Sequence, residues 1–105
     1  NYPGLPAHPQ HHIAAKHFRR FGAIMSFELE ESIDCFDFQN RLQVVISSSN
    51  LGDTRTLAIP VAHTIFYEIG AERRAAMGIP DGMIRLSVGI EDGDDLLEDF
   101  RQALA

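Results

Sequence analysis

The strongest pattern in the chain is an alternation of apolar residues with other residues over positions 83–90. The apolar positions are Ile84, Leu86, Val88 and Ile90. A period of two is typical of a strand with one buried face. We therefore predict a strand here, with Arg85 on the opposite face.

Three further strands are predicted by shorter patterns. Residues 23–30 alternate from Met25 onward, and the segments 43–47 and 54–59 carry apolar runs that favour strands. Pro60 has no N–H to donate to a neighbouring strand, so it is expected to end the last of them.

Apolar residues at helical spacing predict two helices in the first half of the chain. One covers residues 9–20 and carries a stripe of apolar side chains that we expect to be buried. This stripe consists of Ile13, Ala14 and Phe18. The other helix is expected over residues 32–42, with Ser32 as its N-cap.

Two more helices are predicted in the second half. The first covers residues 70–77, where good helix formers are followed by Gly78 as a stop, and the second covers residues 94–105. Residues 61–69 show neither period and are expected to form a loop with an extended piece. No role is assigned to residues 59–69.

The order of these elements predicts the fold class. Strands and helices alternate, but several connections are too short for parallel crossovers, so antiparallel pairing is favoured. We expect an α+β domain (loosely α/β-type, with two layers) made of a small antiparallel sheet and helices on one face. Its 105 residues suffice for one small core, so residues 1–105 are taken as a single domain.

Composition narrows the class of partner. The formal net charge is −6, which argues against nucleic acid, since phosphate binding depends on an excess of Lys and Arg. No apolar run approaches the roughly 20 residues needed to cross a bilayer, so no membrane span is expected. Cys35 is the only cysteine, which excludes a disulfide within the chain and favours the cytoplasm.

Arg85 is the first candidate for a functional residue. A guanidinium in an otherwise apolar strand has a large desolvation cost unless an anion meets it. One interpretation is an internal salt bridge or a surface position on an edge strand; the other is bidentate binding of a carboxylate or phosphate. The segment 48–52 (Ser-Ser-Asn-Leu-Gly) offers hydroxyls, an amide and backbone donors that could orient such an anion, although the same composition suits an ordinary turn.

Other polar clusters have simpler explanations than chemistry. Four histidines near the first helix fit a solvated face better than a metal site, since no carboxylate or second cysteine completes the set. They are His8, His11, His12 and His17. Cys35 lies on an apolar stripe and is expected to act as a small hydrophobic residue. The acidic residues at 91–99 are attributed to the start of the last helix, because they lack the spacing of a calcium loop.

Several segments together resemble one enzyme family. They are Tyr2-Pro3-Gly4-Leu5 with His8-Pro9-Gln10-His11, then residues 22–27, then residues 70–104. The most specific is Gly78-Ile79 followed by Ile84-Arg85-Leu86-Ser87-Val88-Gly89-Ile90-Glu91-Asp92. The chain resembles the Cys/Met metabolism pyridoxal-phosphate family, which includes cystathionine γ-synthase, cystathionine γ-lyase and β-lyase, methionine γ-lyase and O-acylhomoserine sulfhydrylases.

The resemblance implies both a fold and a place in a larger protein. It implies the small C-terminal, substrate-side domain of a fold-type I enzyme, and the proline-locked opening without methionine also looks like a cut from a longer chain. The large domain of the family holds the Schiff-base lysine and the phosphate-binding residues. Lys16 matches none of those positions, so the cofactor, pyridoxal 5′-phosphate, is expected to bind mainly elsewhere in the parent enzyme.

The same resemblance implies a set of site residues. Arg85 aligns with the arginine that pairs with the substrate's α-carboxylate, and Asn50-Leu51-Gly52 aligns with a Ser-Leu-Gly whose first residue helps to orient that carboxylate. Arg85, Asn50 and Leu51 are therefore the predicted carboxylate-binding residues. Asn50 replaces the family's serine, and Ser49 stands where lyases that cleave cystathionine often carry glutamate, so the type of reaction is left open. No functional residue is carried over from residues 56–64.

Two functions are weighed. In the first, the chain is a domain of a transsulfuration-type lyase or transferase that acts on cystathionine, methionine or O-acylhomoserine, forms a homotetramer and is inactive as an isolated fragment. In the second, it is a free-standing module that binds a small molecule or a protein without catalysis.

Overall fold

The computed structural model describes residues 1–105 and is built on a four-stranded sheet in the order β1-β4-β3-β2. The strands are β1 (Ile24–Glu28), β2 (Ile46–Ser47), β3 (Leu57–Pro60) and β4 (Met83–Ser87). β4 lies between β1 and β3 and is antiparallel to both, whereas β2 is parallel to β3. The α+β class is confirmed, and Pro60 is the last residue of its strand, as predicted.

The parallel edge strand departs from the predicted antiparallel sheet. β2 has only two residues, a length of roughly 7 Å. The connection over residues 48–56 therefore has to return only a short distance before β3 begins. A long helical crossover is needed only when the strands are longer.

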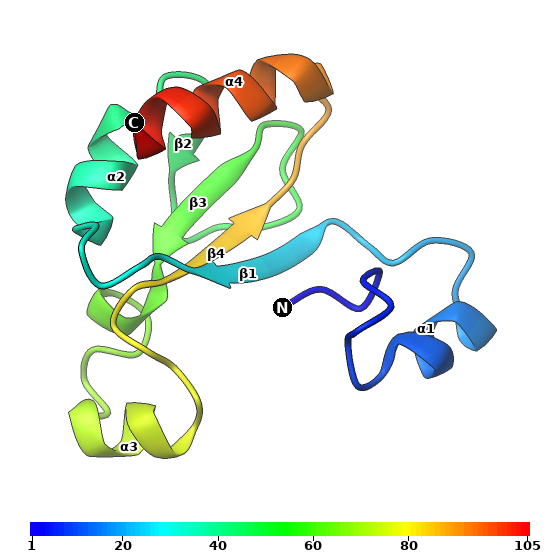
Figure 1. Ribbon diagram of the computed structural model, residues 1–105, viewed down its shortest axis with the longest axis horizontal. Helices are drawn as coiled ribbons and strands as arrows, with labels where there is room; N and C mark the ends of the chain where they lie inside the picture. Colours follow the sequence, from blue (N-terminus) through cyan, green and yellow to red (C-terminus); the bar gives the residue numbers. More distant parts are fainter.

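The chain forms four helices, of which two cover one face of the sheet. The four are α1 (His11–His17), α2 (Cys35–Arg41), α3 (Ala71–Ala76) and α4 (Gly93–Leu104), with a 3₁₀ turn η1 (Val61–His63) after β3. α2 and α4 pack on each other and lie over the sheet, while α1 and α3 lie away from this layer (Figure 1). No helix is both long and apolar enough to cross a membrane.

The core lies between the sheet and the α2–α4 layer. Ile84 and Leu86 of β4 point into it and are almost fully buried, which confirms the predicted inner face of this strand. Three phenylalanines fill the space above them at centroid separations of 6.1 to 6.3 Å. They are Phe27, Phe38 and Phe100.

Ile90 does not belong to this inner face, because β4 ends at Ser87. Its side chain is 82% exposed. Beyond Ser87 the backbone leaves the ladder, since Gly89 donates its N–H to Thr56 and Ile90 donates to the carbonyl of Thr54. The prediction of a strand over 83–90 was therefore three residues too long.

The strand predicted over residues 43–47 is also shorter in the structure, where β2 covers only Ile46–Ser47. The backbone N–H groups of residues 43, 44 and 45 donate to the carboxylate of Asp99 in α4 instead of to another strand. The helix α2 likewise begins later than predicted, because Asp34 is its N-cap and accepts the N–H groups of Phe36 and Asp37. The proposed cap Ser32 lies in the preceding turn.

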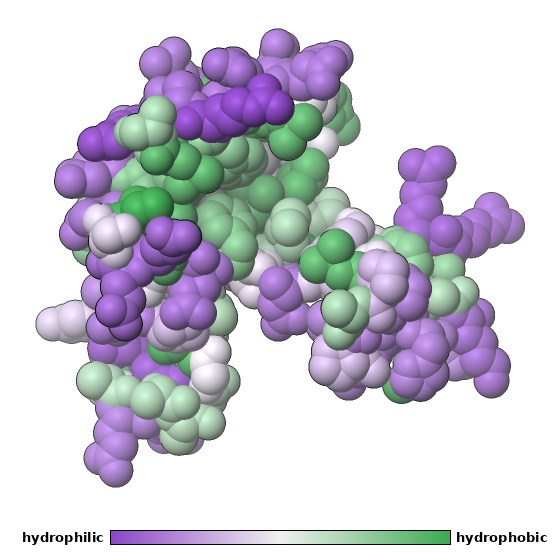
Figure 2. Space-filling model, viewed as in Figure 1, coloured by the Kyte–Doolittle hydropathy of each residue, from purple (hydrophilic) through white to green (hydrophobic).

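The N-terminal segment, residues 1–22, stands to one side of the sheet (Figure 1). Only Ala14 of the predicted apolar stripe is buried, whereas Ile13 and Phe18 are 48% and 64% exposed. The stripe predicted a helix correctly but a buried face wrongly. In Figure 2, hydrophilic residues cover α4, and an apolar area lies beneath it in the direction of this segment.

Candidate functional site

Arg85 lies in the central strand β4, on the face opposite to the helices. Its cross-strand neighbours are Ser26 in β1 and Ile59 in β3. The guanidinium group reaches across the sheet, and its Nη2 donates to the carbonyl oxygens of Ser49 at 2.7 Å and Asn50 at 3.4 Å. The sequence-predicted arginine and the predicted loop are therefore brought together.

The charge of Arg85 has no counter-ion within the chain. The protein contains two ion pairs, Arg55–Asp53 and Arg101–Glu98, and neither involves Arg85. The Nε atom of Arg85 is also buried without a hydrogen-bond partner. The interpretation of Arg85 as part of an internal salt bridge is thus wrong, and two neutral carbonyl groups leave its positive charge unmatched.

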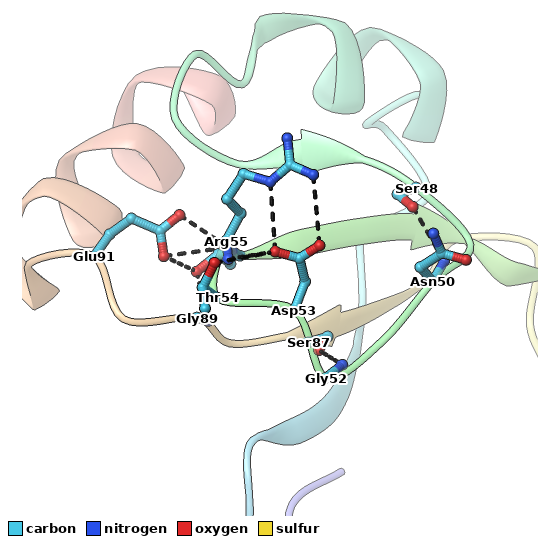
Figure 3. A network of polar contacts seen from close by, with 10 residues as sticks. Ser48, Asn50, Gly52, Asp53, Thr54, Arg55, Ser87, Gly89 and Glu91 are labelled. Carbon is cyan, nitrogen blue, oxygen red and sulfur yellow. Dashed lines mark hydrogen bonds and ion pairs between the residues drawn. The ribbon is translucent and has the colours of Figure 1, made fainter.

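The loop that meets Arg85 is held by short-range and long-range contacts (Figure 3). The Ser48 hydroxyl accepts the N–H of Asn50 at 3.1 Å, and the buried Ser87 hydroxyl accepts the N–H of Gly52 at 2.9 Å. Gly52 has a φ of +74°, a conformation that residues with a Cβ rarely adopt. The turn therefore depends on glycine at this position.

Asn50 and Leu51 occupy the tip of this loop. The side-chain amide of Asn50 is exposed and makes no hydrogen bond within the chain, and the Leu51 side chain is 58% exposed. The carbonyl of Asn50 faces Arg85. The loop thus brings the backbone of Asn50 to the Arg85 guanidinium and leaves the Asn50 side chain exposed.

A cleft borders Arg85 on the side of β1. It has a volume of about 420 Å³ and lies between the sheet and the N-terminal segment. Its wall combines apolar side chains, such as Phe66 and Met83, with polar ones, such as Ser26 and His8. Arg85 is therefore accessible from open space and is not sealed beneath the chain.

Glu91 anchors the end of the loop to the segment that follows β4. Its carboxylate accepts the N–H of Thr56 at 2.8 Å and the Thr56 hydroxyl at 2.8 Å, while that hydroxyl accepts the N–H of Gly89 at 2.9 Å (Figure 3). The hydrogen bond from the Thr56 backbone lowers the pKa of Glu91 more than burial raises it. Sequence reasoning missed this anchor because Glu91 was grouped with the start of α4.

A close backbone approach completes the anchor at Gly89. A Cβ added to Gly89 would lie 2.2 Å from the carbonyl oxygen of Thr54 and 2.5 Å from the carbonyl carbon of Arg55. Only glycine allows these two segments to touch. The loop between β2 and β3 is consequently fixed against the segment after β4.

Asp99 anchors the segment before β2 to α4. It is 4% exposed, and its two carboxylate oxygens accept the N–H groups of residues 43–45 at 2.7 to 2.8 Å. Burial opposes ionisation of this carboxyl, but the N–H donors together outweigh it and lower its pKa. Asp99 was placed among the acidic residues at the start of α4, and only Asp92 caps that helix, through the N–H groups of residues 94 and 95.

The remaining polar candidates are the histidines of the N-terminal segment and Cys35, and of these His8 lines the cleft beside Arg85. His11 contacts the carbonyl of Pro3 and stacks on Phe21, and no group of three or more potential metal ligands comes together in the structure. Cys35 is 6% exposed, and burial, followed by the nearby charge of Asp34, raises the pKa of its thiol. Neither the histidines nor Cys35 form a reactive centre in this structure.

The chain has no lysine near Arg85 that could form a Schiff base with pyridoxal phosphate. Lys16 is its only lysine and is exposed on α1, away from the sheet. A Schiff base needs a lysine amine at the reacting centre. The residues near Arg85 instead fit the recognition of an anion.

Comparison with known proteins shows the family of this chain. The family model for Cys/Met metabolism PLP-dependent enzymes matches residues 1–105. The chain is 42% identical over 107 residues to O-acetyl-L-homoserine sulfhydrylase 1 of Thermus thermophilus, covering 100% of this chain and 25% of that protein. It is 42% identical over 105 residues to cystathionine gamma-lyase of Bacillus subtilis, covering 98% of this chain and 27% of that protein.

Solved structures give the same result. The fold matches cystathionine gamma-lyase from Lactobacillus plantarum complexed with L-serine at a TM-score of 0.92 and 38% identity, over 97% of this chain and 27% of that one. It matches cystathionine gamma synthase from Xanthomonas oryzae pv. oryzae in complex with cystathionine at a TM-score of 0.89 and 42% identity, over 98% of this chain and 27% of that one. The chain spans about a quarter of the length of the relatives it matches. This chain belongs to the family of Cys/Met metabolism enzymes that depend on pyridoxal phosphate.

Proposed function

We propose that this chain is the C-terminal, substrate-side domain of a longer pyridoxal-phosphate enzyme of sulfur amino-acid metabolism, and that Arg85 binds the α-carboxylate of the substrate. The observation that carries this proposal is the guanidinium of Arg85, which has no ion-pair partner within the chain and contacts the backbone of the loop that carries Asn50. The short span of the chain relative to its relatives, together with an exposed Lys16 as its only lysine, supports a domain that is inactive alone.

The substrate class follows from what the relatives have in common. Their names cover O-acetylhomoserine, O-succinylhomoserine, methionine and cystathionine. All of these are amino acids or their derivatives with an α-carboxylate, whatever bond is broken. A domain that recognises this shared group serves a lyase or a transferase equally well, so the substrate is of the cystathionine, methionine or O-acylhomoserine class.

Arg85 is suited to orient such a substrate. A guanidinium presents a planar set of N–H donors that matches the two oxygens of a carboxylate. The carbonyls of Ser49 and Asn50 take Nη2 and restrain the plane of the group, and Nη1 and Nε make no hydrogen bond within the chain. Asn50 supplies a further amide donor, and Leu51, exposed on the same loop, completes the proposed set of carboxylate-binding residues.

Orientation is the contribution of this domain to catalysis. Bound pyridoxal phosphate supplies an electron sink for the carbanion formed on the substrate. Which bond breaks depends on how the substrate is held relative to the cofactor plane. Arg85 fixes the carboxylate end and thereby the rotation of the substrate about its Cα bonds.

We also propose a cellular compartment and an assembly for the parent enzyme. A single buried cysteine fits a reducing cytoplasm. By analogy with the family, the parent is a homotetramer whose partners are its own subunits and its amino-acid substrate, with neither nucleic acid nor a membrane involved.

The test is the variant Arg85→Ala in the full-length gene product. Loss of a buried charged contact costs on the order of 2–5 kcal/mol, so KM should rise by at least about 30-fold while cofactor absorbance is unchanged. Arg101→Ala, which removes an exposed arginine on α4, is the matched control. Unchanged kinetics in Arg85→Ala, or a gene product with no large lysine-bearing domain, would overturn the proposal.

A further inference from the structure

Ser87 lies on the same face of β4 as Arg85, two positions further along. It is 1% exposed, between Ile24 of β1 and Leu57 of β3. A hydroxyl at such a position is costly unless it has a hydrogen-bond partner. Its partner is the N–H of Gly52, at 2.9 Å and 35 positions away in the sequence (Figure 3).

Two side chains of one strand therefore hold the two ends of a four-residue segment. Arg85 contacts the carbonyls of Ser49 and Asn50, and Ser87 accepts the N–H of Gly52. β4 is hydrogen-bonded on both sides, to β1 and to β3. Residues 49–52 are thus held in place by contacts to β4, a strand that is itself paired on both sides.

The two contacts differ in what they can do for an anion. Arg85 supplies the charge, whereas Ser87 lies beneath the loop and has no exposed surface with which to touch a ligand. The hydroxyl of Ser87 instead determines where the loop lies. Because the loop carbonyls hold one amino group of the guanidinium, the position of the loop also determines the orientation of Arg85.

We propose that Ser87 is a positioning residue of the carboxylate site: by accepting the Gly52 N–H, it holds residues 49–52 where Arg85 and Asn50 can bind one carboxylate together. This inference rests on the function proposed above. Without the hydroxyl, the Gly52 N–H loses its acceptor and the loop is free to move, so the guanidinium keeps its charge and loses part of its orientation. Cofactor binding, which is proposed to lie mainly in the rest of the parent enzyme, stays the same.

The test uses the full-length enzyme with Ser87→Ala, and with Thr54→Ala as the matched control. Thr54 also loses a hydroxyl in the same connection, but this hydroxyl contacts only its neighbour Asp53 on the surface. Each variant is assayed with an amino-acid substrate and with the corresponding α-carboxamide. Hydrogen–deuterium exchange of the peptide that contains Gly52 is measured in parallel.

Ser87→Ala is expected to raise KM for the carboxylate substrate by about threefold to tenfold, the equivalent of one net hydrogen bond. The value of kcat should stay within about twofold, because the reacting groups are unchanged. Discrimination between carboxylate and carboxamide should fall by the same factor as KM rises, and exchange at Gly52 should accelerate. Ser87→Cys, which keeps a weak acceptor of similar size, should fall between wild type and Ser87→Ala.

The results separate this inference from the proposal on which it rests. If Arg85→Ala leaves discrimination against the carboxamide unchanged, the carboxylate site itself is wrong. If Arg85→Ala abolishes discrimination but Ser87→Ala behaves like Thr54→Ala, only the role of Ser87 is wrong. A loss of activity in Ser87→Ala that is equal for the carboxylate and the carboxamide also overturns the positioning role, since it would reflect general damage to the fold.

Discussion

Thr56 and Glu91 are joined by hydrogen bonds from both the backbone N–H and the hydroxyl of Thr56, although they lie 35 positions apart. The same hydroxyl accepts the N–H of Gly89. Thr56 is fully buried, so each of these groups depends on the others for its partner. This network ties the connection before β3 to the segment after β4.

Thr56→Val should therefore destabilise the protein. The substitution keeps the shape of the side chain but leaves the Gly89 N–H without its acceptor, which costs about 1–3 kcal/mol. Urea denaturation gives the free energy of unfolding directly. Thr54→Val, which removes a surface hydroxyl next to it, should stay within about 0.5 kcal/mol of wild type, and equal losses in both variants would argue against the network.

Gly89→Ala should be more damaging than a glycine substitution elsewhere. The new Cβ would lie 2.2 Å from the carbonyl oxygen of Thr54, so one backbone segment has to move. A loss of at least about 2 kcal/mol is expected, as for overpacked positions. At Gly93 an added Cβ meets nothing within 4 Å, so Gly93→Ala is the control and should be close to neutral. A larger loss of stability in Gly93→Ala than in Gly89→Ala would contradict the close contact at Gly89.

Asp99→Asn should destabilise the contact between α4 and the segment before β2. The carboxylate accepts three backbone N–H groups, whereas an amide would turn an NH₂ group toward some of these donors. The expected loss is about 1.5–3 kcal/mol, the value of hydrogen bonds to a charged group. Glu98→Gln, on an exposed position of the same helix, provides the comparison in chemical denaturation.

The same carboxylate predicts a pH dependence of stability. The pKa of Asp99 is lower in the folded protein than the ordinary value of 3.8, so the unfolded chain binds more protons at acidic pH. Stability from this group is thus complete above the unfolded pKa and is lost as pH falls through the folded pKa. The acid limb of the unfolding free energy, measured from about pH 5 to pH 3, should be shallower in Asp99→Asn. An unchanged slope would show that Asp99 does not contribute.

Cys35 should resist thiol reagents in the folded protein. Burial raises the pKa of its thiol, and the charge of Asp34 adds to this effect, so little thiolate forms near neutral pH. Labelling with a chromogenic disulfide should be slow in buffer and complete in urea. Rapid labelling without denaturant would show that the start of α2 opens readily.

The sequence predicted those parts of the fold that depend on local pattern. β4 and α4 were found because their periodicities are strong, and Arg85 was found because a charge interrupted an apolar strand. The limits of β2 and the exposure of Ile90 were not predictable in this way, since both depend on distant hydrogen-bond partners. Asp34 and Ser32 are equally good caps in isolation, and only the course of the chain before α2 selects Asp34.

The residues of the candidate site also fall into two groups, those that the sequence predicted and those that only the structure reveals. Asn50 and Leu51 came from a resemblance in sequence, and the structure brings their loop to Arg85. Ser87 and Glu91 gave no signal, because a serine in a strand or an acidic residue before a helix has many ordinary explanations. Their partners, Gly52 and Thr56, become visible only when segments 35 positions apart are placed together.

The most direct test of the central proposal is a crystal structure of the full-length enzyme with an amino-acid substrate or inhibitor bound. We predict that both carboxylate oxygens lie within about 3 Å of guanidinium nitrogens of Arg85, the usual length of charge-assisted hydrogen bonds, with the Asn50 loop beside them. A carboxylate bound by other residues, while Arg85 contacts only the carbonyls of Ser49 and Asn50, would contradict the proposal.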